Sequence, residues 1–177
     1  MELRLLTETE KKITYREQIL DMMYEADNDF VPPMSARFSP FQTDLSGKPS
    51  ATDGIVTYYN GMVNESMLCA IEDGRIVGFV TFVENMKYKV FEGILPNLYI
   101  CTLIVRPEAR GRGLTYKMYD HLFDALYPKH SLFTRTWSTN FAHSSILKKY
   151  GFDEIHRIAN DRGEGIDTVY FGKVRGD

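Results

Sequence analysis

The segment Arg110–Thr115 has the residue types of an anion-binding turn. It reads Arg-Gly-Arg-Gly-Leu-Thr and joins an apolar run, Leu98–Val105, to a segment with helical periodicity. The first N–H groups of a helix have no partner within the helix and carry a partial positive charge, so an anion is favoured there. The two glycines leave the backbone accessible, and the two arginines add charged donors. The turn is therefore predicted to hold a pyrophosphate; an ordinary strand-to-helix connection with solvated arginines is the alternative.

The residues around this turn resemble a signature of the GNAT family of acyl-coenzyme A N-acyltransferases. Leu103–Ala109 reads Leu-Ile-Val-Arg-Pro-Glu-Ala and runs directly into the turn. The family's pattern is Gln or Arg, two residues, Gly, one residue, then Gly or Ala. Arg110 and Gly113 match this pattern, and Thr115 departs from it because it is small but β-branched. Its hydroxyl could instead donate to a phosphate.

A second segment, Asn140–Phe152, resembles another signature of the family, in which an Asn is followed by a helix and a terminal Gly-Phe. In the family the Asn often touches the pantetheine arm, and the seventh residue after it is often a Tyr that protonates the leaving thiolate. That position is Leu147 here, as is common in the subgroup that resembles ribosomal-protein N-terminal acetyltransferases. From the residues alone, Leu147 belongs to a core stripe and Asn140 is a helix cap.

The resemblance implies acetyl-coenzyme A (acetyl-CoA) as co-substrate, without a metal ion. Its pyrophosphate would bind the turn, and its pantetheine arm would pair with the edge of the preceding strand. The implied binding residues are Leu103, Ile104, Val105, Arg110, Gly111, Arg112, Gly113, Leu114, Thr115 and Asn140.

The general base is less evident than the donor site. The family often places a Glu on the central strand, but Leu98–Val105 contains no carboxylate. Its polar side chains, Tyr99, Cys101 and Thr102, are predicted to pack in the core. His143 lies one helical turn before residue 147 and is the candidate catalytic residue, because an imidazole can accept a proton near physiological pH. A solvated His near the start of a helix is the alternative.

The rest of the chain must supply the elements that position these residues. Apolar periodicity and turn signals predict strands over 3–6, 67–71, 75–84, 98–105, 131–137, 154–160 and 167–173, and helices over 10–24, 51–63, 114–127 and 140–150. Asp73-Gly74 predicts a hairpin turn, and the Pro-rich segment 27–53 is predicted to be a packed loop. This order resembles the whole GNAT domain. We expect an α/β (α+β) fold, with a central mixed, mostly antiparallel sheet of six to seven strands flanked by about four helices, in one domain spanning residues 1–177.

The composition limits the function classes. The 177 residues are 44% hydrophobic, as in a globular protein, and the net charge of -3 gives no general affinity for nucleic acid or anionic membranes. Cys69 and Cys101 lie in apolar segments, which suits buried thiols in a reducing compartment, and the four histidines show no ligand spacing with them. No apolar run approaches the roughly 20 residues that span a bilayer, so a cytoplasmic protein is expected.

Two functions follow from these observations. The first is an N-acetyltransferase in which an acceptor amine attacks the thioester of acetyl-CoA directly. Its acceptor would be a small-molecule amine or a peptide N-terminus, in a pocket walled by Phe30–Phe41 with Tyr58 and Tyr59. The second is a non-catalytic module that binds or senses acyl-CoA, because the Tyr and the strand carboxylate are missing. A homodimer is common in the family and is left open.

Overall fold

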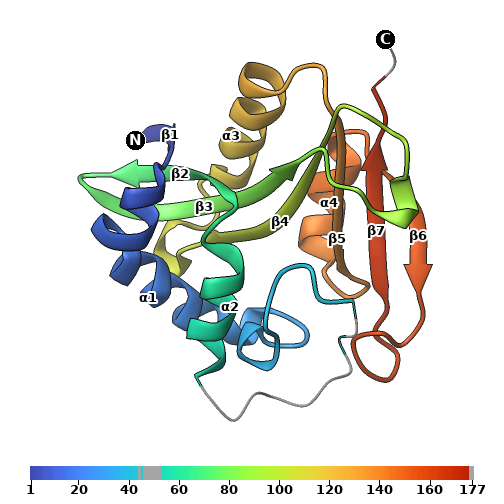
Figure 1. Cartoon of the computed structure of the whole chain (residues 1–177), viewed down its shortest axis with the longest axis horizontal. Coiled ribbons are helices and arrows are strands. Elements are labelled where there is room, and N and C mark those ends of the chain that lie inside the picture. The colour runs from blue at the N-terminus through green and yellow to red at the C-terminus, as the bar shows by residue number, and fades with distance from the viewer. Residues whose placement is uncertain (44, 46–52, 176–177) are drawn as a thin grey trace.

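The computed structural model describes residues 1–43, 45 and 53–175, which form one seven-stranded sheet with helices on both faces (Figure 1). The strands are β1 (Glu2–Leu5), β2 (Ser66–Glu72), β3 (Arg75–Glu84), β4 (Asn97–Val105), β5 (Ser131–Trp137), β6 (Asp153–Ile158) and β7 (Thr168–Lys173). Their spatial order is β1-β2-β3-β4-β5-β7-β6. Neighbouring strands are antiparallel except β4 and β5, which are parallel, so the predicted mixed, mostly antiparallel sheet is confirmed.

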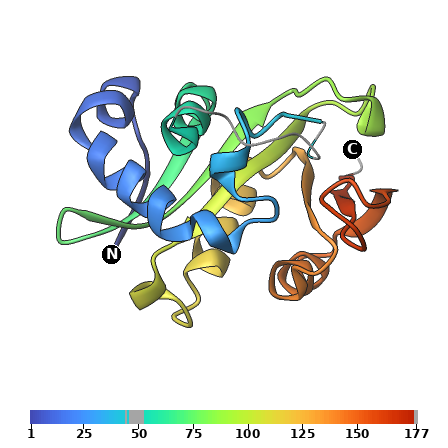
Figure 2. The ribbon, with the colours of Figure 1, turned by 90° about the horizontal axis from the view of Figure 1, so that it is seen from below.

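The helices divide between the two faces of the sheet. They are α1 (Arg16–Ala26), α2 (Gly54–Met62), α3 (Leu114–Asp120) and α4 (Phe141–Lys149). Figure 2 shows α1 and α2 above the sheet and α3 and α4 below it. Each face has its own hydrophobic core, one beneath α1 and α2 and the other beneath α3 and α4.

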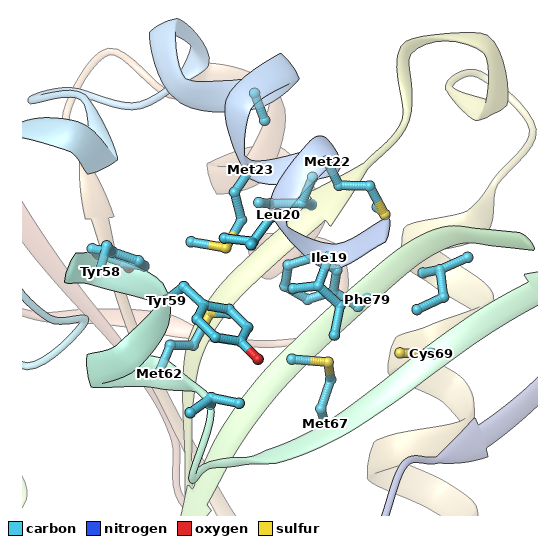
Figure 3. Packing of buried hydrophobic residues seen from close by; sticks show 14 of the residues in the cluster. Ile19, Leu20, Met22, Met23, Tyr58, Tyr59, Met62, Met67, Cys69 and Phe79 are labelled. Carbon is cyan, nitrogen blue, oxygen red and sulfur yellow. The ribbon is translucent and has the colours of Figure 1, made fainter. Parts of the chain in front are cut away.

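The core beneath α1 and α2 is rich in methionine and aromatic side chains. Met22 and Met23 of α1 and Met62 of α2 are fully buried, and they pack with Phe79 of β3 (Figure 3). Burying one such side chain stabilises a protein by about 1.5–3 kcal/mol, so this contact fixes both helices on the sheet.

The local signals explain the ends of several elements. Asp73 and Gly74 both have positive φ, 49° and 77°, as a type I′ turn between β2 and β3 requires. Asp53 caps α2, since its side chain accepts from the N–H groups of Ile55 and Val56 at 3.1 and 3.2 Å. Of the predicted helix 51–63, residues 51 and 52 lie outside the described residues.

Two predicted helices are not continuous α-helices. The predicted helix 10–24 is a π-helical turn, Glu10–Thr14, followed by α1. The predicted helix 114–127 is α3 followed by a second π-helical turn, His121–Leu126. The apolar spacing does not reveal the extra residue in these wider turns.

The Pro-rich segment after α1 is packed, as predicted, over the part that the structure describes. It contains two short 3-10 turns, Asp27–Asp29 and Met34–Ala36. Met34 is fully buried, and Phe30 packs against the core beneath α1 and α2. Residues 44 and 46–52 of this segment lie outside the described residues.

Candidate active site

The site forms where β4 and β5 separate. The two strands pair in parallel from Asn97 and Ser131 to Ile100 and Thr134, and no pairing follows. Figure 1 shows them together at one end and diverging towards the other. At the last pair the Thr134 hydroxyl donates to the Ile100 carbonyl at 3.1 Å. The carboxyl-terminal half of β4 therefore has an open edge.

A β-bulge lies at the point of separation. Thr81 of β3 pairs with Thr102 and Phe82 pairs with Ile100, so Cys101 is the extra residue of β4. Beyond it, the N–H of Arg106 donates to a carbonyl on the β3 side at 3.0 Å. Because backbone groups alternate along a strand, the N–H groups of Leu103 and Val105 point into the gap. The sequence carries no signal for this bulge.

A cavity of about 330 Å³ occupies the gap. Leu103, Ile104 and Val105 line it from β4, and Arg135 and Trp137 line it from β5. The start of α3, the first half of α4 and Phe30 complete its wall. It thus connects the predicted phosphate turn with the side of the sheet that carries α1 and α2.

The predicted acceptor wall is only partly correct. Phe30 lines the cavity, as expected. Tyr58 and Tyr59 instead pack in the core, where they are 1% and 3% exposed. The Tyr58 hydroxyl forms a hydrogen bond with that of Thr102 on β4, and the Tyr59 hydroxyl donates to the carbonyl of Lys11, so neither ring enters the gap.

The glycine-rich turn is open above the start of α3. Gly111 and Gly113 both have φ of 73°, and a Cβ atom at either position would meet no heavy atom within 4 Å. No side chain caps the first turn of α3. The unpaired N–H groups and the open space together suit a phosphate.

The two arginines of the turn form ion pairs with exposed carboxylates. Arg110 Nη2 lies 2.6 Å from Asp29, and Arg112 Nη2 lies 2.6 Å from Glu72. Both arginine side chains are about half exposed, at 47% and 50%. Exposed pairs of this kind contribute only about 0–1 kcal/mol, so a phosphate could take the place of either carboxylate.

Asn140 lines the cavity and also caps α4. Its Oδ1 accepts from the N–H of His143 at 3.2 Å, and its Nδ2 donates to the Thr136 hydroxyl at 3.0 Å. The structure therefore confirms the cap. A contact of Asn140 with a pantetheine arm stays a prediction.

His143 lies in the cavity wall and is half-buried there. Its Nε2 is 2.7 Å from the hydroxyl of Tyr119, a fully buried residue of α3. Burial lowers the pKa of His143 to about 4, which argues against proton uptake near physiological pH; the catalytic role of His143 stays a prediction. The neutral imidazole is a weak base at neutral pH.

Position 147, where the family often has a Tyr, is confirmed as a core position. Leu147 is fully buried in the core beneath α3 and α4, and Ile146 and Tyr150 pack against the same core. Leu147 itself does not line the cavity.

Glu65 is a buried carboxylate next to the site that the sequence analysis did not identify. It lies between α2 and β2, where its carbonyl accepts from the buried Lys11 ammonium, and it is only 6% exposed. Neither carboxylate oxygen has a hydrogen-bond partner of ordinary geometry among the described residues. Burial raises its pKa to about 7, partly offset by the nearby Thr81 hydroxyl and Cys101 thiol.

Glu65 therefore reaches the bulge from another part of the chain. Cys101, beside it, lines the cavity. Asn64-Glu65-Ser66 has the composition of a solvated turn, so the local sequence gave no indication of burial.

Other predicted features fall within the ranges that the structure describes. Cys69 and Cys101 are both free thiols. Across residues 1–43, 45 and 53–175, no three His, Cys, Asp or Glu side chains form a cluster that could hold a metal ion. Nor does any helix of these ranges have the length and apolarity needed to cross a membrane.

Comparisons with known proteins agree with this architecture. The model of the acetyltransferase (GNAT) family matches residues 23–152. No curated protein sequence matches the chain significantly. Among solved structures, ribosomal-protein-alanine N-acetyltransferase from Brucella melitensis is 16% identical, with a TM-score of 0.68 over 99% of this chain and 100% of that one.

Two further solved structures contain acetyl-CoA or coenzyme A. The yncA protein from Salmonella typhimurium, solved with its cofactor acetyl-CoA, is 17% identical, with a TM-score of 0.66 over 100% of this chain and 95% of that one. An aminoglycoside 6'-N-acetyltransferase complexed with coenzyme A is 11% identical, with a TM-score of 0.66 over the whole of both chains. At these identities the likeness shows the fold.

Proposed function

We propose that this chain, which belongs to the acetyltransferase (GNAT) family, transfers an acetyl group from acetyl-CoA to a primary amine that attacks the thioester directly. The observation that carries the proposal is the gap between β4 and β5. It joins an open phosphate turn to a strand edge with free N–H groups and then to a cavity large enough for an acceptor. A cytoplasmic location is part of the proposal.

The donor site consists mainly of backbone groups. The N–H groups at the start of α3, with Arg110 and Arg112, would hold the pyrophosphate, and the edge at Leu103 and Val105 would pair with the pantetheine arm. Acetyl-CoA supplies the acetyl group as a reactive thioester. Strand N–H groups in the gap are fixed dipoles that can stabilise developing negative charge on its carbonyl oxygen without reorganising.

Glu65 is our candidate for the proton acceptor, through water, because its carboxylate oxygens are buried next to Cys101 and do not line the cavity themselves. A lysine-like amine with a pKa of about 10.4 pays roughly 4.6 kcal/mol to become neutral at pH 7, so a base is useful. A carboxylate with a pKa of about 7 is matched to that task at neutral pH. The leaving thiol, with a pKa of about 8.5, needs only about 2 kcal/mol of help, so the absence of a Tyr at position 147 is tolerable.

Calorimetric titration with acetyl-CoA tests the donor site. We expect binding, and we expect Arg112→Glu to weaken it at least about tenfold, because the change adds a negative charge beside the pyrophosphate and Glu72. Arg157→Glu is the matched control, since Arg157 is exposed, paired with two carboxylates and distant from the turn in sequence. An absence of binding at millimolar acetyl-CoA would contradict the proposal.

An amine screen with detection of released thiol tests catalysis. Turnover with a primary amine supports transfer. Binding without turnover across a broad panel, with hydrolysis excluded, would favour the acyl-CoA binding or sensing module instead. The similar structures name acceptors as different as ribosomal-protein alanine and an aminoglycoside, so the family alone does not select the amine.

A further inference from the structure

Three buried or half-buried arginines gather on the acceptor side of the cavity. Arg37 precedes α2, Arg135 lies on β5 and Arg162 lies in the connection between β6 and β7. Arg37 and Arg162 are each 6% exposed, and Arg135 lines the cavity itself. Arginines this deeply buried need partners for both their charge and their donors.

Two aromatic rings of the cavity wall connect these arginines. The Arg37 guanidinium lies 5.7 Å from the centre of the Phe30 ring, and the Arg162 guanidinium lies 5.8 Å from that of Trp137. The Phe30 and Trp137 rings are 5.7 Å apart, and both line the cavity. We call Arg37, Phe30, Trp137, Arg162 and Arg135 the arginine wall.

The hydrogen bonds of the three arginines do not neutralise them. Arg37 donates to the carbonyl of Pro32, Arg135 to that of Pro40 and Arg162 to that of Val31 at 2.7 Å. None of the three forms an ion pair with a carboxylate of the described residues. The hydrogen bonds to described residues use Nε and Nη2 of Arg37, both Nη atoms of Arg135, and Nε and Nη1 of Arg162.

Among the described residues, Asp27 and Asp161 face these arginines without forming an ion pair with them. Asp27, which faces Arg37, accepts from the N–H and hydroxyl of Ser35, and Asp161, which faces Arg162, accepts from Thr168. Burial, followed by the charges of the other two arginines, lowers the pKa of Arg162 to about 9. The arginines thus lie close enough to feel one another's charge.

We propose that the acceptor amine carries an oxyanion, a carboxylate or a phosphate, which Arg135 binds in the cavity, while Arg37 and Arg162, packed against the Phe30 and Trp137 rings, add positive charge next to it. The arrangement would hold the anionic end of the acceptor while its amine is directed towards Cys101 and Glu65 at the bulge. Guanidinium donors match the two oxygens of such groups. A purely cationic acceptor, such as a polyamine, would be repelled by the same charges. This inference rests on the proposed acetyl transfer to an amine.

Matched acceptors test the inference on the whole protein. L-Phenylalanine and phenethylamine differ in the carboxylate, and phosphoethanolamine and ethanolamine differ in the phosphate. Rates are compared at equal concentrations of the neutral amine, so that the different amine pKa values do not enter. We expect kcat/KM to be at least about tenfold higher for the anionic member of one pair, and the pair that responds identifies the oxyanion.

Variants show whether the arginines cause the preference. Arg135→Gln and Arg162→Gln should reduce it to about twofold or less while acetyl-CoA binding is retained. Arg157→Gln is the control, because it removes the same charge from an exposed position. Equal kcat/KM for the two members of both pairs in the wild type overturns the inference. A preference that is retained in both Arg135→Gln and Arg162→Gln overturns it as well.

The outcome is separable from that of the proposed function. If no amine is acetylated, the acetyl-transfer proposal fails, and the same pairs are titrated into the protein saturated with coenzyme A. Tighter binding of the anionic member would then support the anion site alone. Equal binding would overturn it.

Discussion

The hydroxyl of Tyr58 lies 3.0 Å from that of Thr102, and both side chains are buried. This hydrogen bond connects α2 to β4 at the residue that follows the bulge. It fixes the helix that leads into Glu65 relative to the open strand edge. The geometry of the gap therefore depends on a contact between two residues that are 44 positions apart in the sequence.

Tyr58→Phe should destabilise the protein by about 1–3 kcal/mol, because the Thr102 hydroxyl would lose its partner in the core. Urea unfolding of Tyr58→Phe, Thr102→Val and the double variant would measure the effect. We expect the double variant to be more stable than the sum of the single effects implies. Strict additivity would show that the two hydroxyls do not interact.

Glu65→Gln should lower kcat substantially and remove a rise in activity centred near pH 7, because Gln cannot accept a proton. A pH profile of kcat/KM for both proteins, with one amine acceptor, is the measurement. Acetyl-CoA binding by the variant serves as the control for folding. A variant that keeps the wild-type profile would exclude Glu65 as the proton acceptor.

Glu65 should also make the protein less stable as the pH rises from about 4.5 to about 7. In that interval the unfolded chain releases the carboxyl proton while the folded protein retains it, so the free energy of unfolding falls. A shift of this size corresponds to at most about 3 kcal/mol. Denaturation of the wild type and Glu65→Gln across this range should show the fall only in the wild type. Parallel curves would contradict the buried carboxyl.

His143 should stay neutral between pH 5 and 8, because burial lowers its pKa to about 4. The unfolded chain binds this proton below about 6.5, so the contribution of His143 to stability is present above that pH and is lost as the pH falls towards 4. NMR titration of its ring protons is the direct measurement. A midpoint near 6.5 would restore His143 as a candidate base.

Gly113→Val should weaken acetyl-CoA binding more than it destabilises the protein. The new Cβ atom would meet no heavy atom within 4 Å and would occupy the space above α3, and φ of 73° adds strain. Gly74→Val, at φ of 77° and equally open, is the matched control in a turn of the β2–β3 hairpin. Calorimetry and thermal unfolding of both variants separate the two effects. Equal affinities would remove the turn from the donor site.

Local sequence sufficed for much of the fold, and it was enough to place the turn that we propose for the phosphates. Asp73-Gly74 and the alternation of apolar residues each act over a few positions, so they can be read directly from the chain. The binding turn is likewise contiguous, since Arg110–Thr115 joins one strand to the next helix.

The acceptor side could not be predicted in the same way. Glu65, Arg37 and Arg162 come from three connecting segments, and each has the composition of an exposed loop. Only the packing of those segments on the sheet buries these three charged side chains and places them next to the gap. The lowered pKa of His143 could not be anticipated either, because its burial is a property of the folded chain.

The bulge at Cys101 has a consequence for the whole of β4. Leu98 and Ile100 pack in the core beneath α3 and α4, and so do Leu103 and Val105, although the first two are even-numbered and the last two odd-numbered. The extra residue thus shifts the phase of the strand by one position. In a strand of regular alternation, Leu103 and Val105 would face α1 and α2, and the backbone groups now offered to the gap would turn with them. One additional residue therefore decides which side chains of β4 face α3 and α4 beyond the bulge, and with them which backbone groups lie along the open edge.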